Sequence, residues 1–162
     1  MEVISERLVQ ETWQEVAGFS PSRGKIEMTK LGESQPELLS FMVTFTQDLD
    51  QEVKELAMCM FFVVYRIFEK GSKKKIGKIL DTEIIESFES NEKLVGELEG
   101  AHEKFLERIA KTTLMAQPYV MKYVLFTLME PDEKDPIELT NENIGHLFLL
   151  FKTVIDILNQ VA

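Results

Sequence analysis

The residues that most resemble a site for chemistry are Glu99 and His102, in the sequence Glu99-Gly-Ala-His102. A glutamate and a histidine at this spacing lie on one face of a helix, and the same Glu-x-x-His motif supplies metal ligands in di-iron carboxylate bundles. Such a site needs a second motif, but the other histidine, His146, has Asn143 at the matching position. We therefore favour a hydrogen-bonded structural histidine, with a carboxylate–histidine metal site as the alternative.

A second pair of interest is Arg66 and Asp156, which occupy equivalent places in two long apolar segments and carry opposite charges. One hypothesis is that they meet as a buried ion pair, which would specify how the two segments pack. The alternative is that each side chain extends separately to the surface. In neither case do they indicate chemistry.

Lysines are concentrated after the first of these apolar segments, at Lys70, Lys73, Lys74, Lys75 and Lys78. Lysines are common where a helix ends, so a solvated turn is the simplest interpretation, and a surface for an acidic partner is the alternative. The segment does not match a phosphate-binding loop, because Gly71 and Gly77 are one residue too far apart and Ile79 replaces the hydroxyl residue.

Composition limits the classes of function. The 162 residues have a formal net charge of −10, which argues against duplex nucleic acid as a partner. Residues 1–81 carry 11 basic and 13 acidic side chains and residues 82–162 carry 7 and 15, so a partner that is cationic would be expected to bind the second half. No pattern typical of a nucleophilic enzyme is present, and no cofactor is predicted.

The single cysteine, Cys59, lies within an apolar run and is expected to be a buried thiol. The N-terminus has no pattern of a signal peptide, and the longest apolar run, Leu56 to Tyr65, is too short to cross a bilayer. These features predict a cytoplasmic protein without a membrane partner.

The elements that must position these residues are helices, and they include a repeat. Gln35-Pro36 and Gln117-Pro118 each open an apolar stretch that is followed by an acidic turn and a longer apolar stretch. The two openings align without a gap, Phe41 with Tyr123 among them. The pattern indicates two pseudo-symmetric helical hairpins, over residues 36–70 and 118–160, with an insertion in the second acidic turn.

Helical periodicity and capping residues predict a single all-α domain of six or seven helices over residues 1–162. Ser22 is the expected cap of a second helix that ends at Gly32, and Asp50 and Thr140 or Asn141 are expected caps of the long hairpin helices. The expected helices cover 3–17, 23–31, 36–47, 50–68, 73–113 with a break near Asp81 or Ser90-Asn91, 118–129 and 140–160.

The first hairpin resembles a HEAT-type repeat, because Asp48, Val53, Lys54 and Ala57 stand where that family places its turn aspartate and the first residues of its second helix. The resemblance covers residues 36–70 only. It implies a non-enzymatic helical scaffold that binds macromolecules along one surface.

We expect a helical interaction or regulatory module that binds a protein partner or itself, because methionines and phenylalanines are concentrated on the hairpin helices. A helix that is apolar on every side also needs cover, which a homodimer could provide. The alternative is a bundle that binds a small apolar ligand or a metal at Glu99 and His102, with an enzymatic activity left open.

Overall fold

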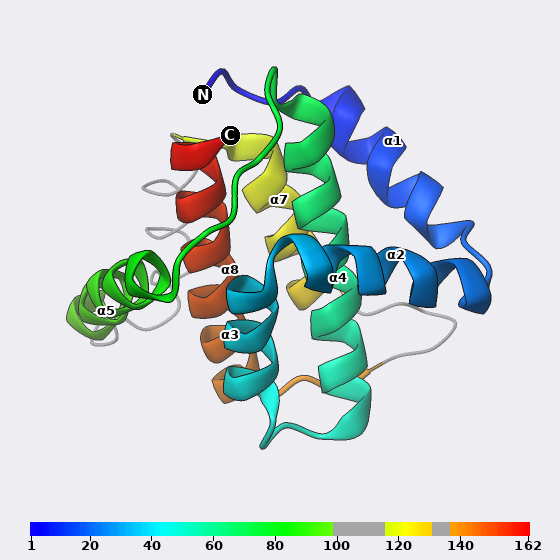
Figure 1. Cartoon of the computed structure of the whole chain (residues 1–162). Coiled ribbons are helices and arrows are strands. Elements are labelled where there is room, and N and C mark those ends of the chain that lie inside the picture. Colours follow the sequence, from blue (N-terminus) through cyan, green and yellow to red (C-terminus); the bar gives the residue numbers. More distant parts are fainter. Residues whose placement is uncertain (99–115, 131–136) are drawn as a thin grey trace.

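The computed structural model describes residues 1–98, 116–130 and 137–162, and in these residues it contains seven helices and no strands. The prediction of an all-α bundle is confirmed (Figure 1). The helices are α1 (Glu6–Ala17), α2 (Pro21–Ser34), α3 (Pro36–Thr46), α4 (Gln51–Gly71), α5 (Asp81–Leu98), α7 (Pro118–Met129) and α8 (Asn141–Val161).

Local sequence explains where most helices begin. Pro36 and Pro118 occupy the first turns of α3 and α7, where the missing N–H of proline costs no hydrogen bond. The hydroxyl of Thr140 caps α8 by accepting a hydrogen bond from the Asn143 N–H (3.0 Å). The predicted limits of α2 were wrong, because Ser20 caps it instead of Ser22 and the helix continues through Gly32.

The centre of the molecule is formed by α4 and α8, which pack against each other (Figure 1). Every described helix contributes to one apolar core around them. The sequence indicated that α4 is apolar nearly all round, and the structure shows that Glu52, Glu55 and Cys59 form an exposed stripe along it. The other central helix, α8, is buried along most of its length.

By length and composition, α8 is also the one helix in the described parts of the chain that could cross a membrane. The apolar stretch of α8 is 56% buried inside the protein, and core helices of globular proteins meet the same criterion.

The helices are arranged with a pseudo-two-fold symmetry between a first half, residues 1–71, and a second half, residues 72–162. The hairpin α3–α4 corresponds to α7–α8, and α1 corresponds to α5. The contacts of α1 and α5 are counterparts: α1 packs against α4 and α7, as α5 packs against α8 and α3. The predicted duplication thus extends to the first helix of each half, α1 and α5.

Candidate functional site

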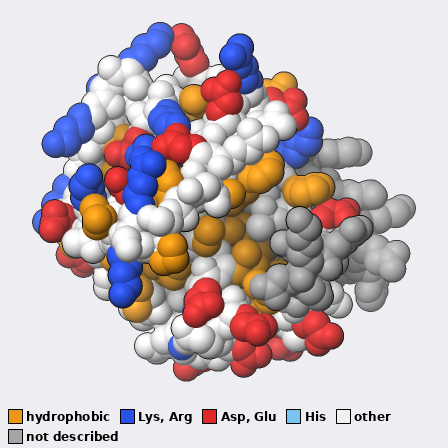
Figure 2. All heavy atoms as spheres, turned by 90° about the vertical axis from the view of Figure 1, so that its right-hand side faces the viewer, with side chains coloured by type: hydrophobic (Ala, Val, Ile, Leu, Met, Phe, Trp, Pro, Cys, Tyr) orange, Lys and Arg blue, Asp and Glu red, His pale blue; other side chains and the backbone are white. Residues whose placement is uncertain are grey.

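A largely apolar groove lies between α1 and α7. We call it the α1–α7 groove; its volume is about 440 Å³. Its lining comes from α1 and α7 alone: Glu6, Val9, Gln10, Trp13, Tyr119, Lys122, Tyr123, Phe126 and Thr127. Figure 2 views the molecule from the side on which α1 lies, and hydrophobic side chains gather there in a hollow surrounded by charged ones.

Large apolar side chains on this face are unusually exposed. Phe126 is 65% exposed, Met129 48% and Trp13 41%. A second depression, lined by Tyr119, Phe126 and Met129, continues the groove along α7. Contiguous exposed aromatic and methionine side chains are typical of surfaces that bind another molecule.

Polar contacts fix the walls of the groove. At one end, Lys122 Nζ on α7 bonds to Glu6 Oε1 on α1 at 2.7 Å, and this ion pair joins the two helices. On the floor, the Thr127 hydroxyl donates to the Tyr123 carbonyl oxygen at 2.8 Å. Burial raises the pKa of the Tyr123 phenol, so this side chain is neutral at physiological pH.

The symmetry-related helix pair, α3 with α5, is closed by three aromatic rings. Phe45 lies 5.0 Å from Phe41 and 4.7 Å from Phe88, measured between ring centroids, and Phe41 and Phe88 are 5.6 Å apart. We call this cluster the phenylalanine junction. It occupies the position that corresponds to the α1–α7 groove in the other half of the molecule.

The predicted metal ligands Glu99 and His102 lie outside the described residues. In the described parts of the chain, no group of three or more His, Cys, Asp or Glu side chains is arranged to hold a metal ion. His146 has a structural role: its Nε2 atom lies 2.6 Å from the Phe45 carbonyl oxygen, so this nitrogen donates to the C-terminal turn of α3.

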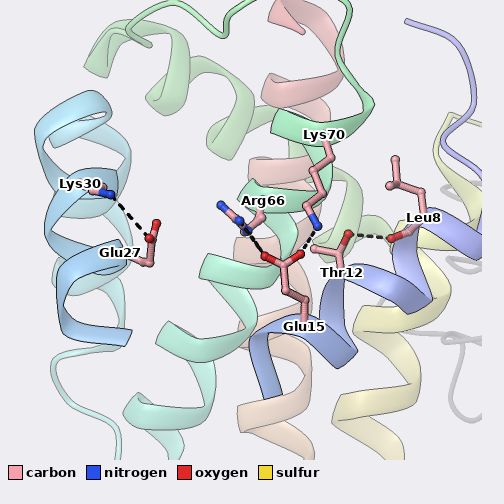
Figure 3. Close-up of polar contacts among 7 residues, drawn as sticks. All are labelled: Leu8, Thr12, Glu15, Glu27, Lys30, Arg66 and Lys70. Atoms are coloured by element: carbon pink, nitrogen blue, oxygen red, sulfur yellow. Dashed lines mark hydrogen bonds and ion pairs between the residues drawn. The ribbon is translucent and has the colours of Figure 1, made fainter. Parts of the chain in front are cut away.

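The hypothesis that Arg66 and Asp156 pair with each other was wrong. Arg66 Nη2 bonds to Glu15 Oε1 on α1 at 2.7 Å, and Lys70 also contacts this carboxylate (Figure 3). Hydrogen bonds from Lys70 and Arg66 lower the pKa of the Glu15 carboxyl. Each residue of the predicted pair therefore faces the first helix of its own half and not the symmetry axis.

Asp156 belongs to a buried polar cluster between α5 and α8. Lys152 Nζ donates to Asp156 Oδ2 at 2.6 Å and to Asn91 Oδ1 at 2.8 Å, and the Asn91 amide donates to Thr153 Oγ1 at 3.2 Å. An adjacent polar cleft of about 570 Å³ includes Glu83 and Asp156. Because the lysine and asparagine are satisfied within the cluster, it acts as a packing contact between these helices.

The predicted lysine cluster lies on the surface after α4. Lys73, Lys74 and Lys75 are exposed, and Lys73 forms an ion pair with Glu2 at 3.1 Å. Such exposed pairs contribute little to stability. The prediction that residues 73–80 are helical was wrong, because α5 begins only at Asp81.

Cys59 is exposed, and the prediction of a buried thiol was wrong. It falls on the outward stripe of α4, which the apolar composition of the surrounding run does not reveal. Desolvation by its neighbours still raises the pKa of the thiol, so the reactive thiolate is disfavoured.

The structural role of two buried glutamines was not predicted from the sequence. Gln35 and Gln117 are 0% and 1% exposed, and each precedes the proline that opens a hairpin. Gln35 Oε1 accepts from the Ile79 N–H (3.0 Å), and Gln35 Nε2 donates to the Gly77 carbonyl (2.8 Å). The side chain thus pairs with the backbone of an extended segment from the other half.

Gln117 repeats this geometry with the N-terminal segment. Gln117 Oε1 accepts from the Ile4 N–H (2.9 Å), and Nε2 donates to the Glu2 carbonyl (3.0 Å). We call the two arrangements the glutamine latches. Glutamine is not a favoured N-cap residue, so its presence before the proline of both hairpins was the signal in the sequence that these side chains have another structural role.

The glutamine latches and the equivalent helix contacts show that the α1–α7 groove and the phenylalanine junction occupy equivalent positions in the two halves. The predicted hairpin over residues 36–70 is present as α3–α4, and its resemblance to a HEAT-type repeat stays a prediction. Comparison of the chain with protein-family models, with curated proteins and with solved structures gave no match.

Proposed function

We propose that the protein is a non-enzymatic helical interaction module that binds a hydrophobic segment of a polypeptide partner in the α1–α7 groove. The observation that carries the proposal is the difference between two symmetry-related helix pairs. One pair is joined by three phenylalanine rings in contact, although Phe45 stays 38% exposed, and the other has no third ring at the aligned position and leaves Phe126 65% exposed beside a cavity. Leaving such side chains exposed is unfavourable in an isolated chain, and a partner would bury them.

The shape of the surface favours a helical partner segment. Tyr119, Phe126 and Met129 follow one face of α7 at helical spacing and line two adjoining depressions. From Tyr119 to Met129 this row extends about 15 Å along the helix axis, which matches roughly three turns of a docked amphipathic helix.

The test uses peptide display, with Trp13 as the reporter because it is the only tryptophan of the chain. Random 12-residue peptides are selected on the wild-type protein, and their affinities are measured from the Trp13 emission. Phe126→Asp is expected to weaken the selected peptides at least tenfold, because it places a charge on the apolar surface. Peptides that bind Phe126→Asp as tightly as the wild type would contradict the proposal.

A matched control is Ile26→Asp, which changes another exposed apolar residue (56%), on α2 and outside the lining of the groove. It should leave the peptide affinities unchanged. A loss of binding in both variants would indicate general surface stickiness and no specific groove.

The alternative function is binding of a small apolar ligand, and the volume of about 440 Å³ supports it because it lies within the usual range for ligand pockets. A native mass spectrum distinguishes the two. An added mass that is retained by the wild type and lost in Thr127→Phe would favour the small ligand. The metal site proposed at Glu99 and His102 has its own test, the metal content of His102→Ala.

A further inference from the structure

We infer that the α1–α7 groove receives an aromatic side chain of the partner, which lies between Trp13 and Tyr123 where Phe45 lies in the other half. The partner segment is a helix that carries a lysine or arginine one turn from this aromatic residue. The inference rests on the proposed function and specifies what the partner must contain.

The correspondence of the two sites follows from the duplicated sequence and the glutamine latches. The gap-free alignment of the two hairpins places Phe45 opposite Thr127 and Phe41 opposite Tyr123. The latches place Ile4 and Ile79 in equivalent positions. Trp13 follows Ile4 by nine residues, as Phe88 follows Ile79, so Trp13 corresponds to Phe88.

The phenylalanine junction shows what fits between these two walls. In it, the Phe45 ring packs against both Phe41 and Phe88 at centroid distances of 5.0 and 4.7 Å. These distances are typical of favourable aromatic pairs. In the α1–α7 groove both walls remain aromatic, but Thr127 stands where the third ring would be attached.

The chemistry of the groove favours an apolar occupant. The Thr127 hydroxyl already donates to the Tyr123 carbonyl oxygen, and the Lys122 ammonium is paired with Glu6 at one end of the groove. The rest of the lining consists of Val9, the aromatic rings and one further polar side chain, Gln10. A ring without buried polar atoms therefore fits best.

Charge identifies the rest of the partner segment. Glu130 is exposed at the C-terminal end of α7 and has no ion pair among the described residues. The helix dipole adds partial negative charge at the same end. Glu130 follows Thr127 by three residues, about 5 Å along the axis, so a basic residue one turn from the aromatic anchor would reach it. A second copy of this chain, which also carries a net charge of −10, fits less well.

The experiment compares designed peptides on matched proteins. The host is a 15-residue helical peptide with phenylalanine at the anchor and lysine four residues later. Its variants carry cyclohexylalanine or alanine at the anchor, or glutamate in place of the lysine. We expect the phenylalanine peptide to bind at least tenfold tighter than the alanine peptide and about threefold tighter than the cyclohexylalanine peptide. The glutamate peptide should bind more weakly, and the difference should shrink in high salt.

Two protein variants locate the site. Thr127→Phe attaches the missing ring to α7 and should abolish the preference for the aromatic anchor, while raising the melting temperature because it fills the cavity. Trp13→Leu keeps an apolar wall but removes the ring, and should reduce the preference for phenylalanine over cyclohexylalanine; its affinity is read by calorimetry because the reporter is lost.

Equal affinities for the phenylalanine and alanine peptides, or an unchanged preference in Thr127→Phe, would overturn the inference. Display-selected peptides that still need Phe126 would then leave the proposed function standing. Toluene that binds the wild type but not Thr127→Phe, with no binding by any peptide, would overturn the polypeptide as the source of the ring. A dimer of the wild type that Thr127→Phe dissociates would show that the occupant is a second copy.

Discussion

The phenylalanine junction and the α1–α7 groove are built from equivalent helices, yet one is closed and the other is open. In the first, Phe41, Phe45 and Phe88 fill the space between α3 and α5. In the second, the walls stay aromatic while Thr127 takes the position of Phe45. The backbone arrangement is therefore compatible with three aromatic rings in contact between the two helices. At the aligned third position the two sites differ, with Phe45 in the junction and Thr127 in the groove.

The two sites are comparable because the glutamine latches hold both halves in the same way. Each latch belongs to one half and binds the backbone of the other, so neither half is complete alone. Side chains that replace backbone partners in this way remove buried unpaired N–H and C=O groups. The latches thus convert a repeated sequence into a symmetric tertiary structure.

The largest expected effect comes from breaking this frame with Gln35→Ala. The substitution removes a buried amide and leaves the Ile79 N–H and the Gly77 carbonyl without their partner, which should cost about 3 kcal/mol of unfolding free energy. Urea denaturation measures it. Gln117→Ala is the matched variant and should cost less, because its partner segment is the N-terminus, which can move to regain water. Equal and small effects, below about 1 kcal/mol, would show that the latches do not hold the halves together.

A smaller effect is expected when the phenylalanine junction is opened by Phe45→Thr. Phe45 is 38% exposed, so the loss should be about 2 kcal/mol, less than for a fully buried phenylalanine. The same variant should create a second aromatic slot between Phe41 and Phe88. Toluene binding, followed by NMR, should then double in stoichiometry. An unchanged stoichiometry would mean that the walls close when the ring is removed, and that the two sites are not equivalent.

The smallest effect concerns the contacts that hold the first helix of each half. Glu15→Gln removes a carboxylate that Arg66 and Lys70 share, and it should destabilise the protein by at most about 1 kcal/mol at pH 7. Because the folded-state pKa of Glu15 lies below its ordinary value of 4.5, this stability is present above that pH and disappears as the pH falls through the lowered pKa.

The difference between Glu15→Gln and the wild type should therefore vanish in acid, which urea titrations at a series of pH values would show. A difference that persists at pH 2 would assign the effect to packing. The corresponding contact in the second half, where Lys152 bonds to Asn91 and Asp156, is more buried.

Much of the helical structure could be predicted from the sequence, since the signals are local. Pro36 and Pro118 each mark the first turn of a helix, and Thr140 caps α8. The boundaries failed where two local signals competed, as at Ser20 and Ser22. The segment before α5 was predicted as helix but is extended. The prediction failed because the hydrogen bonds of this segment go to the side chain of Gln35, which is distant in the sequence.

The sequence by itself therefore determined the helices, the duplication and the aromatic and methionine content of the hairpins, because these depend on neighbouring residues and on periodicity. Only the tertiary structure decided the partners of Arg66 and Asp156, the exposure of Cys59 and the roles of the two glutamines. It also decided that Thr127 faces a cavity while its counterpart Phe45 closes a junction. The physical reason is that each of these features joins segments far apart in the chain, and their meeting is set by how the helices pack.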